Sequence, residues 1–462
     1  MRKFLRHIRL GYKLAMKSIA LAAIFAATTF AADSANPKPD ERFKTDLLVV
    51  VAHPDDETEI GAYLARVIFD EHKRVAVVFG TRGNQGGDSE SLAQSASLGV
   101  IREIEARQAM ASFGVMNVWF LNGLDTPGQN VLGSLETWNH GDPLGKLVRI
   151  MRLTRPTVVA TWLPAWVAGE NHGDHQAAAV IATEAFDMAG NPTAFPEQVA
   201  VPFNRFDVGN LTEGLRPWQP QKLYFFSDTA HPETIKDKGP NYSSTDTSAS
   251  HHVSYARLAA QECAFHLTQG DSGQLAKAAL EKNDLHYFET PVLFVFGKSH
   301  VKTSPTSDLF EGVIPTGIPY QTSPGYATPK LDGPSLELGG PWHFYTAFWQ
   351  AHDLQHLPGL IAPEIMAKPS ARFVIPLLVQ NPTESTLPVT MSVDLPAGWK
   401  FVRQPPSPFQ VDPQVDYSYV FEVKTPSEQK GWQFITIKAT SQEQLIGTIR
   451  IRVEVTPDAM PE

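Results

Sequence analysis

The sequence predicts an α/β fold: a doubly wound, Rossmann-like, mostly parallel sheet with helices on both faces, followed by a small all-β immunoglobulin-like sandwich. From about Phe43 to Leu293, short apolar runs alternate with segments whose apolar residues recur every three or four positions. That alternation is typical of strands and helices around a parallel sheet. From about Ser370 the apolar residues recur at every second position, which favours half-buried strands.

The first region divides into elements at clear stop signals. Gly114 stands at a natural C-cap position after one helix, and Pro156 ends another. We expect strands at 46–51, 74–79, 118–121, 157–161 and 222–226. We expect helices at 58–69, 98–113, 144–153, 174–188 and 255–267.

The C-terminal region has five alternating segments, separated by turn sequences such as Asn381-Pro382 and Pro396-Ala397-Gly398. They predict strands at 372–380, 387–395, 417–424, 432–439 and 446–455. The expected domains are therefore residues 43–298 for the α/β part and 370–457 for the sandwich. Residues 299–369 are rich in Pro, Gly and aromatic residues, and we expect a connecting segment that packs on the domains.

The N-terminus is typical of an export signal. Six basic residues lie within residues 2–17, an apolar stretch covers 18–30, and small residues follow at Ala31-Ala32. We expect residues 1–31 to be a signal peptide, and the mature protein to be periplasmic or secreted without an integral membrane span. An uncleaved membrane anchor is the alternative.

Charge and cysteine content limit the possible partners. The chain has 39 basic and 49 acidic residues, a formal charge of -10, and no basic block beyond the N-terminus, which argues against nucleic-acid binding. Cys263 is the single cysteine, so no intrachain disulfide can form. Its apolar helical surroundings indicate a buried small hydrophobic side chain.

Two polar clusters follow predicted strands. Ala52-His53-Pro54-Asp55-Asp56-Glu57 comes directly after the first strand, and His172-Gly173-Asp174-His175 follows the fourth. The carboxyl ends of strands in an open α/β sheet face one crevice, so the clusters can meet in space. Together they offer the His/Asp/His set of a catalytic zinc, with an Asp and a His left for proton transfer. Singly, each motif also suits a helix N-cap or a polar loop.

These motifs resemble the PIG-L/LmbE-like family of zinc-dependent N-acetylglucosaminyl deacetylases. Shorter matches are Thr81-Arg82-Gly83, Arg102–Glu105, Phe113-Gly114-Val115 and His266-Leu267-Thr268-Gln269-Gly270, so the resemblance runs from about Asp46 to Gly270. Two positions depart from the family pattern. Gly173 stands where the family usually has Pro, and the loop after Arg82 lacks the acidic residue that often follows the first Gly. These departures leave the candidate metal ligands unchanged, but the loop expected to bind substrate differs from the family pattern.

The resemblance implies that His53, Asp56 and His175 bind Zn²⁺, that Asp55 is the general base, and that His172 polarises the amide carbonyl or protonates the leaving amine. We add Asp174 to the catalytic set, because it can fix the tautomer of a neighbouring imidazole. Arg82 and Trp166 are expected to bind substrate. Trp138, Trp162 and Trp166 suit either stacking on a sugar ring or packing.

The expected function is a zinc-dependent N-deacetylase in which metal-activated water attacks the amide carbonyl of an N-acetylated sugar or glycoconjugate. A zinc amidase acting on a non-sugar substrate and a non-catalytic glycan-binding protein are the alternatives. The C-terminal region resembles immunoglobulin-like modules of secreted carbohydrate-active enzymes, which implies glycan or surface binding, or packing alone. The sequence specifies neither the substrate nor the oligomeric state.

Overall fold

The computed structural model describes residues 39–87, 93–166, 172–201, 213–229, 231–327, 331–359 and 363–457. The expected signal peptide, residues 1–31, lies outside them. Within the described residues, no helix combines the length and apolar character that a membrane crossing requires. The chain divides into two compact units, residues 1–42 with 192–217, and residues 43–191 with 218–462.

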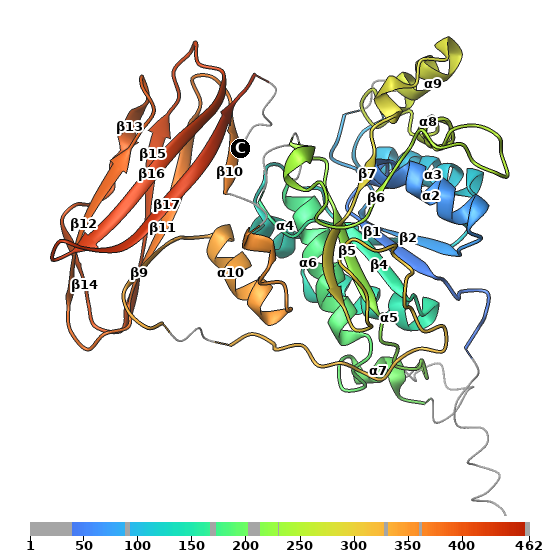
Figure 1. Ribbon diagram of the computed structural model, residues 1–462, viewed down its shortest axis with the longest axis horizontal. Helices are drawn as coiled ribbons and strands as arrows, with labels where there is room; N and C mark the ends of the chain where they lie inside the picture. Colours follow the sequence, from blue (N-terminus) through green and yellow to red (C-terminus); the bar gives the residue numbers. More distant parts are fainter. Residues whose placement is uncertain are drawn as a thin grey trace, which may run out of the picture. The chain divides into compact units, whose positions relative to one another are not determined.

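The smaller unit contains one short described helix, α7 (Pro196–Val199). Three backbone hydrogen bonds tie its surroundings to residues 213–215, among them Leu215 N–H to Gln198 O at 2.8 Å. The larger unit contains both sheet regions predicted from the sequence (Figure 1).

A six-stranded sheet forms the centre of the α/β region, with the order β3-β2-β1-β4-β5-β8. Neighbouring strands are parallel except β8, which runs antiparallel to β5. All five residues of the central strand β1 are buried and apolar, as expected for a parallel strand covered on both faces. The bounds are β1 (Leu47–Val51), β2 (Val75–Thr81), β3 (Val118–Gly123), β4 (Val158–Trp162), β5 (Lys222–Phe226) and β8 (Val295–Ser299).

The strand order reverses beside β1. The chain first moves from β1 to β2 and β3, then crosses back to β4 on the other side of β1. Crossovers are right-handed, so helices before and after this reversal cover opposite faces. Figure 1 shows α2, α3 and α8 on one side and α5 and α6 on the other. Ligands bind at such a switch point, beyond the carboxyl ends of the strands.

The helices follow the predicted order with small shifts in their ends. The predicted helix 58–69 is composite, with a 3-10 turn, an α turn and a π turn in succession. The predicted helix 255–267 ends at Cys263, which is buried as expected. The bounds are η1 (Asp56–Ile60), α2 (Gly61–Ala65), η2 (Arg66–Asp70), α3 (Ser95–Ser112), α4 (Val131–Thr137), α5 (Gly141–Thr154), α6 (Gly173–Met188), α8 (Tyr255–Cys263) and α9 (Ser272–Lys282).

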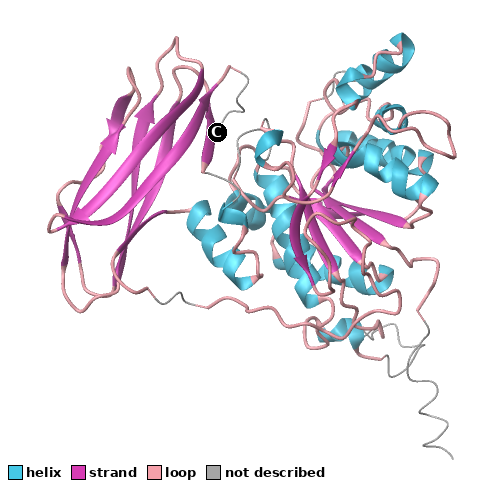
Figure 2. Ribbon diagram, viewed as in Figure 1, coloured by secondary structure: helices cyan, strands magenta, loops and turns pink. Residues whose placement is uncertain are grey.

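The C-terminal region consists of two sheets that share one apolar core (Figure 2). One has the order β13-β15-β11-β9 and is antiparallel, and the other has the order β10-β17-β16-β12-β14, with β10 parallel to β17. The bounds are β9 (Ser335–Leu338), β10 (Glu364–Ala367), β11 (Arg372–Asn381), β12 (Leu387–Asp394), β13 (Lys400–Arg403), β14 (Phe409–Val411), β15 (Val415–Lys424), β16 (Gly431–Ser441) and β17 (Gln444–Val455).

The structure differs from the expected boundary at Ser370, because β9 and β10 precede it and belong to these sheets. Each spans four residues, too few for an alternating pattern to stand out from a Pro-rich segment. The same segment contains the helix α10 (Pro341–Ala351), where Tyr345 Oη donates to Gln176 Oε1 on α6 at 2.7 Å. The segment is therefore structured as well as connecting.

A buried charged network joins the end of α10 to the α/β sheet. Asp187, on α6, lies 2.5 Å from Lys298 Nζ on β8 and 2.7 Å from His352 Nδ1. Lys298 also donates to the backbone oxygen of His352 at 2.8 Å. Burial alone raises the pKa of Asp187, but the hydrogen bond from His352 and the charge of Lys298 outweigh it and lower the pKa below its ordinary value.

Candidate active site

The first motif forms a tight turn between β1 and η1. Asp55 has a φ of 119°, a conformation that costs a non-glycine residue about 1–3 kcal/mol and persists where neighbouring contacts enforce it. The turn places Asp55 and Asp56 in different environments. Asp56 is buried and Asp55 is half-buried.

One oxygen of the Asp56 carboxylate is fixed by three hydrogen bonds. Its Oδ2 accepts the backbone N–H groups of Ala52 and His53, each at 2.9 Å, and Nε1–H of Trp162 at 2.8 Å. Its Oδ1 instead faces two imidazoles. Burial alone raises the pKa of Asp56, but His175 and His53 outweigh it and lower the pKa well below its ordinary value. Asp56 is therefore a fixed carboxylate with one oxygen available for a ligand.

Each of the two imidazoles has one nitrogen toward Asp56 and the other toward a second carboxylate. His53 Nδ1 lies 3.5 Å from Asp56 Oδ1, and its Nε2 lies 3.3 Å from Asp174 Oδ2. His175 Nε2 lies 3.4 Å from Asp56 Oδ1, and its Nδ1 lies 3.4 Å from Asp228 Oδ2. A carboxylate behind a ligating histidine fixes its tautomer, which leaves the opposite nitrogen free to bind a metal.

The spacing of these atoms suits a tetrahedral metal. Two ligand atoms about 2.0–2.1 Å from a tetrahedral zinc lie about 3.3 Å apart. The observed separations of 3.5 and 3.4 Å between Asp56 Oδ1 and the two histidine nitrogens are close to that value. The donor set of two imidazoles and a carboxylate is also one that zinc prefers. By these two separations and by their donor chemistry, the residues present fit zinc. Among the described residues, His53, His172 and His175 also form a group whose ligand atoms lie within 4.8 Å of one another.

The carboxylates around His53 and His175 raise the pKa of both imidazoles. Burial alone lowers the pKa of His175, but Asp56 and Asp228 outweigh it and raise the pKa to about 10. For His53, the charge of Asp56 and the contact with Asp174 likewise outweigh burial and raise the pKa well above its ordinary value. A metal binds the neutral imidazole, so a dication bound here would displace these protons.

His172 lies against both imidazoles, with ring centroids 4.7 Å from His53 and 4.4 Å from His175. Its Nδ1 accepts the backbone N–H of Asp174 at 3.2 Å, which favours the tautomer with hydrogen on Nε2. Burial and the positive charges of His175 and His53 lower its pKa to about 2. His172 is therefore a neutral hydrogen-bond donor beside the cluster.

Asp174 is fully buried and holds its place through Thr126, whose backbone N–H and hydroxyl donate to it at 2.8 and 2.6 Å. The structure thus brings together His53, Asp56, His172, Asp174 and His175. The Asp55 carboxyl has its pKa raised to about 8, first by burial and then by the negative charge of Asp56.

The expected substrate-binding residues make other contacts in the described part of the chain. Arg82 Nε lies 3.0 Å from Glu103 Oε2 on α3. Trp166 is half-buried and stacks on Trp342, with ring centroids 5.4 Å apart. Trp138 and Trp162 are buried, so for these two the packing alternative is correct.

Three residues of the site were missed in the sequence. Asp228 backs His175, Thr126 holds Asp174, and Asp125 accepts the backbone N–H of Gln85 at 2.7 Å while its carboxylate lies close to His53 and Asp174. Each follows a strand of the sheet within a few residues, Asp228 after β5 and the other two after β3. A search for carboxylates just past every predicted strand would have found both acidic residues.

Packing explains the unusual Gly173. A Cβ atom at this position would lie 2.6 Å from Ser134 Oγ and 2.8 Å from Asn130 O, near α4. The Gly173 N–H also donates to Gly128 O at 2.8 Å, a bond that proline cannot make. In this chain the segment around α4 lies where a proline ring would otherwise pack, so glycine is required.

Comparison with known proteins agrees with this architecture. The family model for PIG-L, described as GlcNAc-PI de-N-acetylase, matches residues 48–186. Residues 48–186 are thus similar to a PIG-L/LmbE family deacetylase domain. This confirms the resemblance drawn from the two motifs. The matched range includes His53, Asp56 and His175, whereas Asp228 and His266 lie beyond it.

Among curated relatives, the 1D-myo-inositol 2-acetamido-2-deoxy-alpha-D-glucopyranoside deacetylase of Streptomyces scabiei is 32% identical over 206 residues, which is 39% of this chain and 63% of that protein. The corresponding deacetylase 1 of Catenulispora acidiphila is 28% identical over 208 residues, 42% of this chain and 58% of that protein. The chain thus spans about three fifths of these PIG-L relatives. The N,N'-diacetylchitobiose deacetylase of Pyrococcus horikoshii is 20% identical, with a TM-score of 0.39 over 54% of this chain and 82% of that one.

Proposed function

We propose that this protein is a zinc-dependent hydrolase that removes the acetyl group from an N-acetylated sugar or glycoconjugate. The observation that carries the proposal is the arrangement around Asp56 Oδ1, which faces His53 Nδ1 and His175 Nε2 at 3.5 and 3.4 Å. Asp174 and Asp228 lie behind the two imidazoles. Binding a glycan alone does not need such a set.

His53, Asp56 and His175 would hold the metal. When bound, zinc polarises an amide carbonyl and lowers the pKa of water near it. The relatives' names support a substrate with an acetamido group on a glucopyranoside, and the family description supports N-acetylglucosamine.

The remaining groups have distinct tasks in amide hydrolysis. Asp55 is half-buried and adjacent in sequence to Asp56. Its pKa is raised to about 8 by burial and by Asp56, and a bound dication would lower that pKa again. As a carboxylate it would then take a proton from the attacking water. His172 donates from Nε2 to the carbonyl oxygen, because its Nδ1 already accepts a backbone N–H. Asp174 orients His53. The products are acetate and a free amine, which receives the proton.

The N-terminal sequence supports export of the protein, with cleavage near Ala31-Ala32. Sequencing the N-terminus of protein expressed in a bacterial host with a cell envelope tests this. Mature protein that begins near Ala32 or Asp33 supports export, and an intact Met1 in the membrane fraction supports the uncleaved anchor instead.

A screen for released acetate tests the activity. Purified protein, stripped of metal and then reloaded with zinc, is given N-acetylglucosamine, N,N'-diacetylchitobiose, the inositol glycoside named for the relatives, and simple N-acetyl amines without a sugar. We expect zinc-dependent acetate release from at least one sugar, and release about 10²–10⁴-fold slower from Asp55→Asn. Release from the non-sugar amides alone favours the amidase. Absence of release from every substrate by the zinc-loaded protein would contradict the hydrolase proposal.

A further inference from the structure

The turn that carries Asp55 is held by residues far along the chain. Asp55 N–H donates to Glu57 Oε2 at 3.0 Å, and the other oxygen of Glu57 accepts Nε2–H of His266 at 3.1 Å. Gln269 Nε2 donates to the backbone oxygen of Pro54. Pro54 is therefore in direct contact with Gln269, and Asp55 is linked to His266 through Glu57.

This support is buried. The side chains of Glu57, Glu262 and His266 have no exposed surface, and His266 Nε2 also lies 3.5 Å from Glu262 Oε1. His266 Nε2 thus faces two buried carboxylates.

The same segment reaches the loop after β2. Arg102, buried on α3, donates to the backbone oxygens of Thr268 at 2.6 Å and Gly87 at 2.7 Å, and also to that of Gly83. Thr268 Oγ1 donates to Glu105 Oε2 at 2.8 Å. Residues 266–269 therefore contact both the Asp55 turn and, through Arg102, the glycine-rich loop 83–87.

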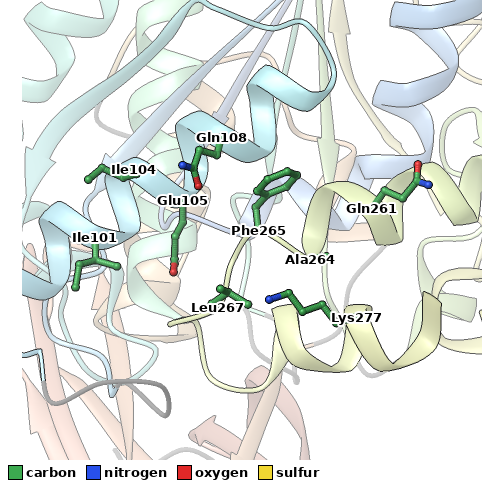
Figure 3. Close-up of a pocket in the computed structure, with 9 residues that line it drawn as sticks. All are labelled: Ile101, Ile104, Glu105, Gln108, Gln261, Ala264, Phe265, Leu267 and Lys277. Carbon is green, nitrogen blue, oxygen red and sulfur yellow. The ribbon is translucent and has the colours of Figure 1, made fainter. Parts of the chain in front are cut away.

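The outer side of this segment is largely apolar. Phe265 and Leu267 line a cavity of about 480 Å³ with Ile101 and Ile104 of α3 (Figure 3). Figure 3 also labels Gln261 on α8, across the cavity from α3. Gln261 is exposed, so it serves as a matched control for Gln269 on the same stretch of chain.

We propose that His266 and Gln269 are positioning residues for the base, and that they hold the Asp55 backbone in its left-handed conformation so that the carboxylate lies beside the metal set. Glu57 transmits the contact from His266, and Gln269 acts on Pro54 directly. The kinetic consequences rest on the proposed hydrolase function, whereas the conformational claim stands without it.

The test compares Gln269→Glu with Gln261→Glu. The first keeps the shape but replaces the donor with a carboxylate that repels the Pro54 oxygen, and the second makes the same change at the exposed control. We expect kcat of Gln269→Glu to fall about 10²-fold, the cost of a misplaced catalytic group, with KM and bound zinc within twofold of wild type. Gln261→Glu should keep wild-type kcat.

At His266 the comparison uses His266→Leu and His266→Gln. The glutamine amide can still donate to Glu57, so it should recover most of the kcat that leucine loses. A merely structural role would lower thermal stability and zinc content in both. If leucine prevents folding, the pair Gln269→Glu and His266→Gln still decides the proposal.

Crystal structures of Gln269→Glu and His266→Leu give a readout that needs no substrate. Asp55 should leave the positive-φ region in at least one of them. Asp55 unchanged in both variants would overturn the proposal, and so would an equal loss of kcat in Gln261→Glu and Gln269→Glu. If the wild type itself releases no acetate, the hydrolase proposal fails. The conformation of Asp55 in the two variants still tests whether His266 and Gln269 hold its backbone.

Discussion

The indole of Trp162 lies parallel to the imidazole of His175, with 4.1 Å between the ring centroids and 2° between the planes. The same indole donates from Nε1 to Asp56 Oδ2 at 2.8 Å. One buried residue of β4 therefore orients two of the three expected metal ligands. Replacing the ring removes both the stacking surface and the donor, so the rigidity of the site depends on the strand as much as on the loops.

Asp228 should tune metal affinity without being a ligand. Asp228→Asn keeps the size but removes the negative charge that lies 3.4 Å from His175 Nδ1, so we expect zinc affinity to fall about 10- to 100-fold. His175→Ala removes a ligand and should lose most of the zinc. His286→Ala, at an exposed histidine paired with Asp284, is the control. Elemental analysis and a competition titration measure the effect, and equal zinc in all three variants would rule out the ligand assignment.

Asp55 and Asp56 should separate by role. Asp55→Asn removes the base, so turnover should fall by about 10²–10⁴ while zinc stays bound. Asp56→Asn should instead weaken zinc binding, because a neutral amide is a poorer ligand than a carboxylate. The acetate assay and zinc analysis of both variants test this. If Asp55→Asn loses zinc and Asp56→Asn keeps it, Asp55 is the ligand and Asp56 is the base.

Gly173 and Gly141 form a matched pair, since each is the first residue of a helix. A Cβ at Gly173 would meet Ser134 and Asn130, whereas one at Gly141 has no atom within 4 Å. We expect Gly173→Ala to cost about 1–3 kcal/mol of unfolding free energy. Gly141→Ala should be neutral or stabilising by less than about 1 kcal/mol. Thermal and urea unfolding measure both, and equal values for the two variants would show that α4 yields to the added methyl group.

The network at Asp187 predicts a loss of stability in acid. The folded-state pKa of Asp187 is lowered, so its contribution is fully present above the unfolded pKa of about 3.9 and is lost as pH falls through the folded value. Urea unfolding between pH 3 and 7 should show this fall below about pH 4, and Asp187→Asn should flatten it. At pH 7, Asp187→Asn should cost about 3–5 kcal/mol, because it leaves Lys298 buried without its carboxylate.

The control for that experiment is Asp142→Asn, at an exposed pair with Lys146 on α5. Exposed pairs contribute about 0–1 kcal/mol, so the change should be small. A pH profile that Asp187→Asn leaves unaltered would assign the acid sensitivity to other carboxylates.

The C-terminal sheets should need strands from before Ser370. A fragment of residues 331–457 contains β9 and β10, whereas 370–457 lacks both. β9 pairs with β11, and Leu336 and Leu338 contribute to the shared core. We expect the longer fragment to unfold cooperatively and the shorter one to be less stable or unfolded. Circular dichroism during heating compares them, and identical transitions would show that β9 and β10 are dispensable.

The sequence predicted the elements whose signal is local. β1 and β5 are continuous apolar runs bounded by polar residues, and α6 is a long apolar helix after a polar turn. The two motifs could be placed at strand ends for the same reason. β8 was not predicted as a sheet strand, because an antiparallel partner for β5 does not follow from a βαβ pattern.

The pattern of apolar and polar residues does not predict which distant segments contact one another. The position of Asp228 just past a strand marks it as a candidate, but only the fold shows that it lies 3.4 Å from His175, which is 53 residues earlier in the chain. The His266 motif was recognised only as part of a resemblance, and its contact with Glu57 comes from the fold. The expected metal ligands could be named from the sequence because they lie in two short motifs, whereas the residues that contact them are dispersed.

The antiparallel strand β8 has a consequence for solubility. Without it, β5, whose sequence is Lys-Leu-Tyr-Phe-Phe, would end the sheet with unpaired backbone groups, and an apolar strand in that position recruits other chains into fibrous aggregates. β8 covers this edge. Phe294, just before β8, and Phe296, within it, donate their N–H groups to the backbone oxygens of Pro240 and Lys238. A chain shortened before β8, although it would retain every expected metal ligand, should therefore precipitate rather than work as a minimal enzyme.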